Sequence, residues 1–320
     1  MNDASSRFVD RLATEKLINE KLSKVRHSSG NSLFVSETIS FDDMDKFVLE
    51  KSQIEVVDNT NGVSHYIIPS FYRKHFYLEN NYIHIYYYPS DSPKYNVLLL
   101  HGLFDDNMAN YMFLIKQLNE LNINIYLMVL PYHFDRKPIE SFFGGEYFFS
   151  ADIYRTRNAF KQTVLDIEAS MQFIGFHNNM PRGLLGFSMG GCAAFRYYLL
   201  KNYLVRTFLL NPVTELKGLA WDTHLLKSIG KDIDESQIPK NVVLKILTDI
   251  DPCENMKTNF NTDNLAIAYS IYDQIIEKNK YDSFIAKIRL KNTTEYLAGH
   301  LNVLRVPRLS RDIYKFMDFK

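Results

Sequence analysis

One serine stands between closely spaced glycines in the stretch LLGFSMGGCAAF, residues 184–195. Ser188 has Gly186 two positions before it and Gly190 two positions after it. The preceding residues are apolar and the following ones favour a helix, so the stretch predicts a strand, a sharp turn and a helix. In that context the G-x-S-x-G pattern pushes a serine hydroxyl into a cleft as a nucleophile. A glycine-rich turn that only packs closely or binds a phosphate is the alternative.

The glycines have a physical purpose in such a turn. Residues two before and two after the serine approach one another, so a Cβ atom on either would clash. The helix beginning at Met189 directs its free N–H groups toward the site. Ser188 is therefore the predicted nucleophile. The N–H of Met189 is a predicted donor to the oxyanion that forms when a serine attacks a carbonyl.

A second oxyanion donor is expected from the stretch NVLLLHGLFDD, residues 96–106. It reads as a buried strand that runs into His101 and Gly102. Enzymes with this nucleophile turn place the second donor in the loop after such a strand. The donor is then the N–H of Leu103 or Phe104, and Leu103 is favoured by its place after His-Gly. We expect His101 to hydrogen-bond within its own loop and to take no proton.

A serine hydroxyl needs a base, and histidine suits neutral pH. With this turn the chain order is serine, then acid, then histidine. Only His224 and His300 follow Ser188. His300 is favoured because EYLAGHLNV reads as a strand ending in Gly-His before the last helix. His224 belongs to a segment that reads as part of a cap, and a histidine that only caps the last helix is the alternative for His300.

The acid that orients the imidazole is predicted in VVLKILTDIDPCEN, residues 242–255. This stretch reads as a strand followed by two aspartates, and Asp251, followed by proline, best fits the loop after the penultimate strand. Asp249 and Glu215 are alternatives. Asp251 lies about 49 residues before His300, which is long for a simple crossover. We therefore expect an extra helix or excursion between them.

The elements that must position these residues alternate from residue 82 onward. Several expected strands are continuous runs of Val, Leu and Ile, which is typical of strands covered on both faces of a parallel sheet. The expected strands are 82–88, 96–101, 124–131, 183–188, 205–210, 242–248 and 294–299. The expected helices are 106–121, 151–176, 189–202, 262–280 and 308–319, with a further, partly helical stretch in residues 1–30 that HSSGNS at 27–32 interrupts.

Taken in order, LLLHGLFDD, GFSMGG, LTDIDP and LAGHLNVL resemble the sequence of an α/β-hydrolase, over about residues 82–320. The stretch from LPYHFDRKP to GGEYFFSADIYRTR is similar to a poorly characterised branch of that superfamily. The resemblance implies an eight-stranded, mostly parallel core flanked by helices, a Ser-His-Asp triad and esterase-like chemistry. Residues 1–80 have no counterpart in these motifs. We expect an N-terminal extension packed on a domain of residues 81–320, with a cap-like segment at about 213–240.

The segment PYHFDR, residues 131–136, ends a predicted strand on the side of the same cleft. His133 and Arg136 are predicted to contact substrate, with Arg136 suited to a carboxylate or phosphate. A loop held by its own ion pair is the alternative. His133 and Asp135 have H-x-D spacing but no evident third ligand, so no metal is predicted. No cofactor is predicted either, because no glycine-rich dinucleotide fingerprint follows the first strand.

Composition limits the class of protein. The formal net charge is zero over 320 residues, which argues against nucleic acid as a partner. The start of the chain lacks a signal-peptide pattern, no window approaches a transmembrane span, and the two cysteines, Cys192 and Cys253, suggest no disulfide framework. We expect a soluble, cytoplasmic protein with two reduced cysteines. The sequence does not indicate an oligomeric state.

These observations predict a serine hydrolase that acts on a small-molecule acyl ester, with lipids among the candidate substrates. Two alternatives share the fold. One is a binding protein without catalysis, whose cleft holds a ligand. The other is an acyltransferase, which uses the same acyl-enzyme but passes the acyl group to an alcohol or thiol in place of water.

Overall fold

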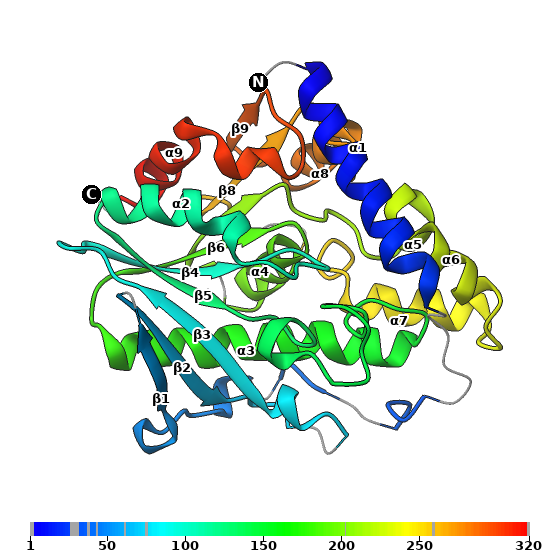
Figure 1. The fold of residues 1–320 in the computed structure, drawn as a ribbon, viewed down its shortest axis with the longest axis horizontal. Coiled ribbons are helices and arrows are strands. Elements are labelled where there is room, and N and C mark those ends of the chain that lie inside the picture. Colours follow the sequence, from blue (N-terminus) through cyan, green and yellow to red (C-terminus); the bar gives the residue numbers. More distant parts are fainter. Residues whose placement is uncertain are drawn as a thin grey trace.

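The computed structural model describes residues 3–25, 32–36, 39–42, 44–60, 62–73, 76–201, 203–257 and 260–318. Its centre is a nine-stranded sheet with the order β1-β2-β3-β5-β4-β6-β7-β8-β9 (Figure 1). Strands β4 to β9 are parallel to one another. Strands β1, β2 and β3 pair antiparallel and form one end of the sheet. The strands are β1 (Glu55–Thr60), β2 (Val63–Pro69), β3 (Tyr82–Tyr88), β4 (Tyr95–Leu100), β5 (Ile123–Met128), β6 (Arg182–Phe187), β7 (Arg206–Leu210), β8 (Leu265–Ser270) and β9 (Asn292–Tyr296).

Helices cover both faces of this sheet. Figure 1 shows α3 on one side and α2 with α9 on the other. The helices are α1 (Asp3–Glu20), α2 (Ala109–Glu120), α3 (Ile153–His177), α4 (Met189–Leu200), α5 (Leu219–Asp222), α6 (Lys227–Asp234), α7 (Lys240–Ile250), α8 (Lys278–Ile288) and α9 (Pro307–Met317). Short 3₁₀ segments lie at Leu22–Lys24, Met44–Lys46, Lys51–Gln53, Leu78–Asn81, Phe134–Arg136, His224–Leu226 and Asn302–Arg305.

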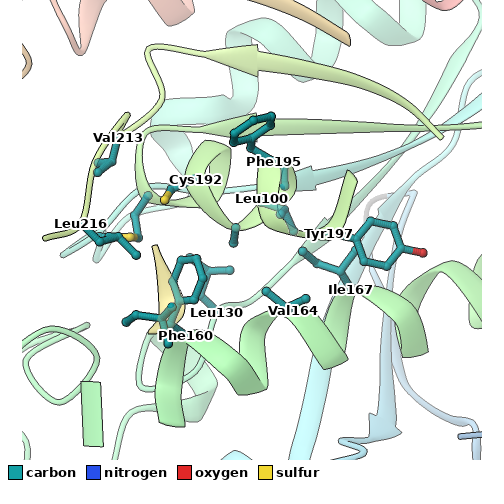
Figure 2. Close-up of a cluster of buried hydrophobic side chains, with 14 of the residues drawn as sticks. Leu100, Leu130, Phe160, Val164, Ile167, Cys192, Phe195, Tyr197, Val213 and Leu216 are labelled. Carbon is teal, nitrogen blue, oxygen red and sulfur yellow. The ribbon is translucent and has the colours of Figure 1, made fainter. Parts of the chain in front are cut away.

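The apolar strands explain the two covered faces. Every residue of β4 is buried, and its side chains alternate between two hydrophobic clusters. Leu98 and Leu100 face the α3 and α4 side, and Val97 and Leu99 face the α2 and α9 side. Figure 2 shows part of the first cluster, where Leu100 lies with side chains of α3 and α4. Burying both faces requires the continuous apolar runs seen in the sequence.

Most expected elements of the core are confirmed to within a few residues, but two are wrong. The stretch 242–248 is not a strand and belongs to helix α7. The stretch 262–280 is not a helix, because it contains strand β8 and the loop that follows. The long interval between residues 251 and 300 is explained by an unpredicted strand of the sheet, β8, and by the crossover helix α8 that leads from it to β9, so no additional excursion is needed.

The first 80 residues contribute to two places. Strands β1 and β2 extend the sheet beyond β3, and helix α1 lies beside the segment that contains α5 and α6 (Figure 1). Segment 213–240 contains α5, a 3₁₀ turn and α6. Of the predicted break at 27–32, residues 27–31 lie outside the described part of the chain. Within the described ranges, no helix combines the length and apolar content that a bilayer span requires.

Candidate active site

Ser188 occupies a strained turn between β6 and α4. Its φ of 54° and ψ of −116° put a non-glycine residue in a region that L-residues rarely adopt. A Cβ atom on Gly186 would lie 2.5 Å from the carbonyl oxygen of Gly190, and one on Gly190 would lie 2.5 Å from the carbonyl oxygen of His101. Both distances are far below any van der Waals contact. The glycines therefore allow the backbone approach that the turn needs.

The imidazole of His300 lies between Ser188 and a carboxylate. His300 Nε2 is 3.0 Å from Ser188 Oγ, and His300 Nδ1 is 2.7 Å from Asp273 Oδ2. A carboxylate accepts, so Nδ1 carries the proton and Nε2 is left to accept from the serine hydroxyl. Ser188 is 8% exposed and His300 is 2% exposed, which leaves the hydroxyl at the edge of a shielded site. This chain of groups has the geometry of a nucleophile, a base and an orienting acid.

Asp273 is itself held firmly after the end of β8. Its Oδ1 accepts hydrogen bonds from the N–H groups of Ile275 and Ile276, each at 2.8 Å. Its Oδ2 also accepts from the hydroxyl of Tyr281 at 2.8 Å. Every one of these partners donates, so the carboxylate is held in place with Oδ2 directed at His300.

The prediction that Asp251 backs the histidine is wrong. Asp251 is fully buried at the end of α7, where its Oδ2 accepts from the N–H groups of Leu216 and Lys217. Its Oδ1 accepts from the N–H of Cys253 at 2.8 Å. Asp251 therefore anchors the segment after β7 and is not a partner of His300. The physical reason is that residues 242–248 were expected to form a strand ending at the edge of the sheet beside His300. They belong to helix α7 instead, so Asp251 does not reach that edge.

The other candidates for acid and base also lie elsewhere. Asp249 pairs with Lys161 at 2.6 Å, and Glu215 lies 3.8 Å from Lys280. His224 is exposed in a 3₁₀ turn. The sequence did hold a signal for the carboxylate beside His300, since LAIAYS is an apolar strand-length run and Asp273 follows its end by three residues. That aspartate lies only 27 residues before His300, as a short crossover requires.

The loop after β4 supports the predicted oxyanion donors. The N–H of Phe104 donates to His133 Nε2 at 3.2 Å, so Phe104 is already committed. Among the residues that the structure describes, the N–H groups of Leu103 and Met189 donate no hydrogen bond. Both residues line the pocket that contains Ser188. The arrangement thus leaves free the two donors that the sequence favoured.

His101 contacts its own loop, as expected, and also joins that loop to the residues after β5. Its Nδ1 lies 2.8 Å from the carbonyl oxygen of Gly102, and its Nε2 accepts from the N–H of Leu130 at 3.0 Å. Complete burial lowers the pKa of His101 to about 4, which keeps the ring neutral. A neutral ring with both nitrogens occupied fixes the loop and is not available as a base.

The prediction that His133 and Arg136 contact substrate is wrong. Both are fully buried, and neither lines the pocket of Ser188. Arg136 pairs with Asp166 at 2.8 Å and donates to the carbonyl oxygen of Val129 at 2.9 Å. His133 accepts from Phe104, and burial holds the pKa of His133 well below its usual value. The segment is therefore a buried support, as the ion-pair alternative stated, although the partner of Arg136 is Asp166.

The Gly-Glu segment that follows PYHFDR also supports the oxyanion loop. The N–H of Gly144 donates to Asp106 Oδ1 at 2.8 Å, and the N–H of Gly145 donates to the carbonyl oxygen of Tyr132 at 2.7 Å. Asp152 begins α3, where its side chain accepts from the N–H of Arg155. Gly144 thus ties this segment to the loop beside Ser188, and Gly145 ties it to the residues after β5.

A cavity of about 280 Å³ opens beside the serine and is mostly apolar. Its walls come from α1, the loop after β4, the turn at Ser188, the segment 213–226 and the loops that carry Asp273 and His300. The apolar lining consists of Ala13, Leu17, Leu103, Phe104, Phe187, Met189, Val213, Leu219, Leu225, Leu226, Ile275, Ile276 and Leu301. Such a cavity suits an apolar part of a small molecule next to the hydroxyl.

Charges around the histidine favour its protonated form. Burial opposes a charged imidazole, but the charge and hydrogen bond of Asp273 and the charges of Asp10 and Asp105 outweigh it and raise the pKa of His300. Asp105 accepts from the N–H of Gly102 and from the hydroxyl of Tyr111, and burial raises its pKa to about 6. The site can therefore stabilise the imidazolium that forms when a serine proton is taken up.

One group among the described residues has metal-ligating side chains close together. Ligand atoms of His65, His84 and Asp135 lie within 4.8 Å of one another. The two rings hydrogen-bond each other at 2.9 Å, and Asp135 accepts from the hydroxyl of Tyr86 at 2.7 Å. These groups are satisfied without an ion, so they give no reason to infer one. That the chain binds no metal or cofactor stays a prediction.

No protein-family model and no curated protein matches the chain. Solved structures do match. Acetyl xylan esterase 1 from Thermoanaerobacterium sp. JW/SL YS485 has a TM-score of 0.58 at 16% identity, covering 86% of this chain and 89% of that chain. TT1662 from Thermus thermophilus has a TM-score of 0.54 at 14% identity, covering 74% of this chain and 95% of that chain. Est1E from Butyrivibrio proteoclasticus, with ferulic acid bound, has a TM-score of 0.53 at 14% identity, covering 74% and 94%.

At these identities the likeness is one of fold. The nine-stranded, mostly parallel sheet with helices on both faces agrees with the architecture that the sequence resemblance implied. The antiparallel strands β1 and β2, within residues 55–69, lengthen that sheet at one end. The chain has the α/β-hydrolase fold.

Proposed function

We propose that the protein is a serine hydrolase that cleaves an acyl ester through an acyl-enzyme. The observation that carries the proposal is the hydrogen-bond chain from Ser188 through His300 to Asp273, at 3.0 and 2.7 Å. The apolar cavity beside Ser188 and the two uncommitted N–H groups support it. Structures of similar fold include proteins named as esterases, which agrees with ester hydrolysis at the level of fold.

The chemistry follows from the direction of each hydrogen bond. His300 Nε2 takes the Ser188 proton while Oγ attacks the ester carbonyl and the carbon–oxygen π bond opens to an oxyanion. The N–H groups of Leu103 and Met189 hold that oxyanion. As the carbonyl re-forms, the ester C–O bond breaks and His300 gives its proton to the leaving alcohol. Water, deprotonated by His300, then attacks the acyl-enzyme carbonyl. As the bond between the carbonyl carbon and Ser188 Oγ breaks, His300 returns the proton to Oγ, and the acid and the free serine are released.

The cavity indicates which part of the substrate it takes. Its lining is mostly apolar and it directly adjoins Ser188. Burying an apolar group there is favourable by about 25 cal/mol per Å². We therefore expect an ester with an apolar group of modest size on one side of the scissile carbonyl.

A covalent probe tests this proposal directly. A fluorophosphonate should label the wild-type protein and should not label Ser188→Ala. The wild type should hydrolyse p-nitrophenyl esters from a panel of increasing chain length, and Ser188→Ala should hydrolyse none of them. Equal labelling of the two proteins would contradict the nucleophile, and a well-folded wild type inert to every probe and ester would favour the non-catalytic binding protein. Product analysis with added alcohols or thiols separates hydrolysis from acyl transfer.

A further inference from the structure

Helix α1 buries a polar stripe in place of an apolar one. Its buried residues are Ser6, Asp10 and Thr14, spaced four apart on one face. On the same helix Phe8 and Leu12 are each 54% exposed. A helix held by the hydrophobic effect would show the reverse arrangement. The face that α1 presents to the rest of the molecule is therefore suited to hydrogen bonding.

Asp10 is the centre of this stripe, and it is fully buried. Its Oδ2 accepts from the N–H of His300 at 2.5 Å and from the N–H of Gln274 at 3.2 Å. Its Oδ1 accepts from the N–H of Leu301 at 3.1 Å. Gln274 directly follows Asp273, so one carboxylate joins the two loops that carry Asp273 and His300. Hydrogen bonds to a charged acceptor are among the stronger ones in proteins.

The neighbouring residues are shaped around this carboxylate. A Cβ atom on Gly299 would lie 2.6 to 2.8 Å from three atoms of the Asp10 carboxyl group, so only glycine leaves room there. Asn302 Oδ1 accepts from the N–H of Gly299 at 2.6 Å, and Asn302 Nδ2 donates to Ser6 Oγ at 3.2 Å. Two members of the polar stripe thus hold the same short loop.

We propose that Asp10 is a positioning residue that fixes His300 and Asp273 relative to Ser188 from an N-terminal helix. This inference rests on the proposed hydrolase function, because positioning matters only if His300 transfers a proton. The hydrogen bonds of Asp10 go to the backbone of residues 274, 300 and 301, and it acts through them. Helix α1 is then a part of the active site that is 290 residues distant in sequence from the histidine it holds.

The charge of Asp10 adds a second effect. Three carboxylates act on His300: Asp273 from the loop after β8, Asp105 from the loop after β4, and Asp10 from α1. Burial disfavours the ionised form of Asp10 and raises its pKa, but the N–H group and charge of His300 and the N–H group of Leu301 oppose that shift. As an anion, Asp10 favours the imidazolium. Its loss should therefore make His300 a weaker base, with a lower pKa.

The test compares Asp10→Asn with Asp3→Asn, which removes the same charge from the exposed end of the same helix. In Asp10→Asn an amide NH₂ faces backbone donors, so the loops shift. We expect kcat to fall about 10- to 100-fold, since small misplacements of reacting groups cost that much. KM should change little, and the acid limb of kcat/KM should move to lower pH. Asp3→Asn should match the wild type in all three quantities.

Asp10→Glu separates position from charge and serves if Asp10→Asn does not fold. It keeps the anion but moves its oxygens by one methylene, so kcat should fall while the acid limb stays in place. Wild-type kcat in Asp10→Glu, or equal kcat and acid limbs in Asp10→Asn and Asp3→Asn, would overturn the proposal.

Amide hydrogen exchange makes the outcome independent of activity. The amides of residues 274, 300 and 301 should exchange faster in Asp10→Asn than in Asp3→Asn, and equal rates would overturn the role of Asp10. If the wild type itself neither reacts with the probe nor cleaves esters, the hydrolase function fails. The exchange rates then still decide whether Asp10 holds the two loops.

Discussion

The two halves of the candidate site are built in different ways. Ser188 is positioned by a local turn, whose glycines lie within six residues of one another. The strain of this turn is visible in the φ of 54° at Ser188. The histidine side depends on distant parts of the chain. Asp273 lies 27 residues before His300, and Asp10 lies 290 residues before it.

The two sides differ in how much of their geometry a short stretch of sequence specifies. A strained turn with backbone approaches of 2.5 Å tolerates few residue types, so its pattern can be recognised in a dozen letters. A carboxylate that meets an imidazole through loop geometry needs only to be an aspartate at the right place. The nucleophile side can thus be predicted from composition and spacing, whereas the acid side requires the correct order of strands.

Replacing the acid should have the largest effect on catalysis. Asp273→Asn should lower kcat by a factor on the order of 10⁴, because the amide no longer fixes the tautomer in which Nε2 accepts the serine proton. Asp251→Asn is the matched control, since it changes another buried aspartate that also lies between Ser188 and His300 in the sequence. It should melt at a lower temperature, yet keep kcat within about threefold per folded molecule. The reverse ranking of the two variants in steady-state assays would restore Asp251 as the acid.

Breaking the buried ion pair of Arg136 and Asp166 should cost stability and leave substrate binding alone. Arg136→Met leaves Asp166 as an uncompensated buried charge, which typically costs about 3–5 kcal/mol. The free energy of unfolding, measured with urea, should fall by that amount. Arg136→Met combined with Asp166→Leu should recover much of the loss. A raised KM with unchanged stability would instead return Arg136 to a role in substrate contact.

A methyl group added at Gly190, in the turn that holds Ser188, should lower the free energy of unfolding. In Gly190→Ala the new Cβ would lie 2.5 Å from the His101 carbonyl oxygen and 2.7 Å from the Leu100 Cβ, and neither atom can move freely. Overpacking of this kind typically costs about 1–3 kcal/mol. Gly175→Ala in α3 is the control, because its Cβ meets the movable guanidinium of Arg182. Comparable unfolding curves for the two variants would mean that the turn relaxes at no cost.

The sequence predicts most of the strands and helices correctly, but it does not identify the carboxylate that lies beside His300. Strands β4 to β7 and helices α2, α3 and α4 follow from apolar runs and their spacing. The error at α7 arose because Val, Ile and Leu dominate both buried strands and buried helix faces. The helical signal was nevertheless present, since Val243, Ile246, Leu247 and Ile250 have the spacing of a helix and are the buried residues of α7. Taking α7 as a strand hid β8, and with it Asp273.

The role of α1 was beyond sequence reasoning for a different reason. Its apolar residues form no regular stripe, and the side chains that it buries are polar. Periodicity of hydrophobic residues finds helices that pack through apolar faces, and it assigns no function to a buried serine, aspartate and threonine. Only the positions of the partner N–H groups, nearly the whole chain away, explain why Asp10 is buried.

The smallest expected effect concerns the pH at which the histidine side becomes active. His300 must be neutral to take the serine proton, and its pKa is raised because the carboxylate charges outweigh burial. kcat/KM for an uncharged ester should therefore fall as the pH decreases through a midpoint above 6.5, the ordinary value for histidine. His101 and His133 do not contribute, because burial lowers the pKa of each. His224→Ala, which removes an exposed ring, should leave the midpoint unchanged, and a wild-type midpoint at or below 6.5 would mean that the surrounding carboxylates do not act on His300 as their positions require.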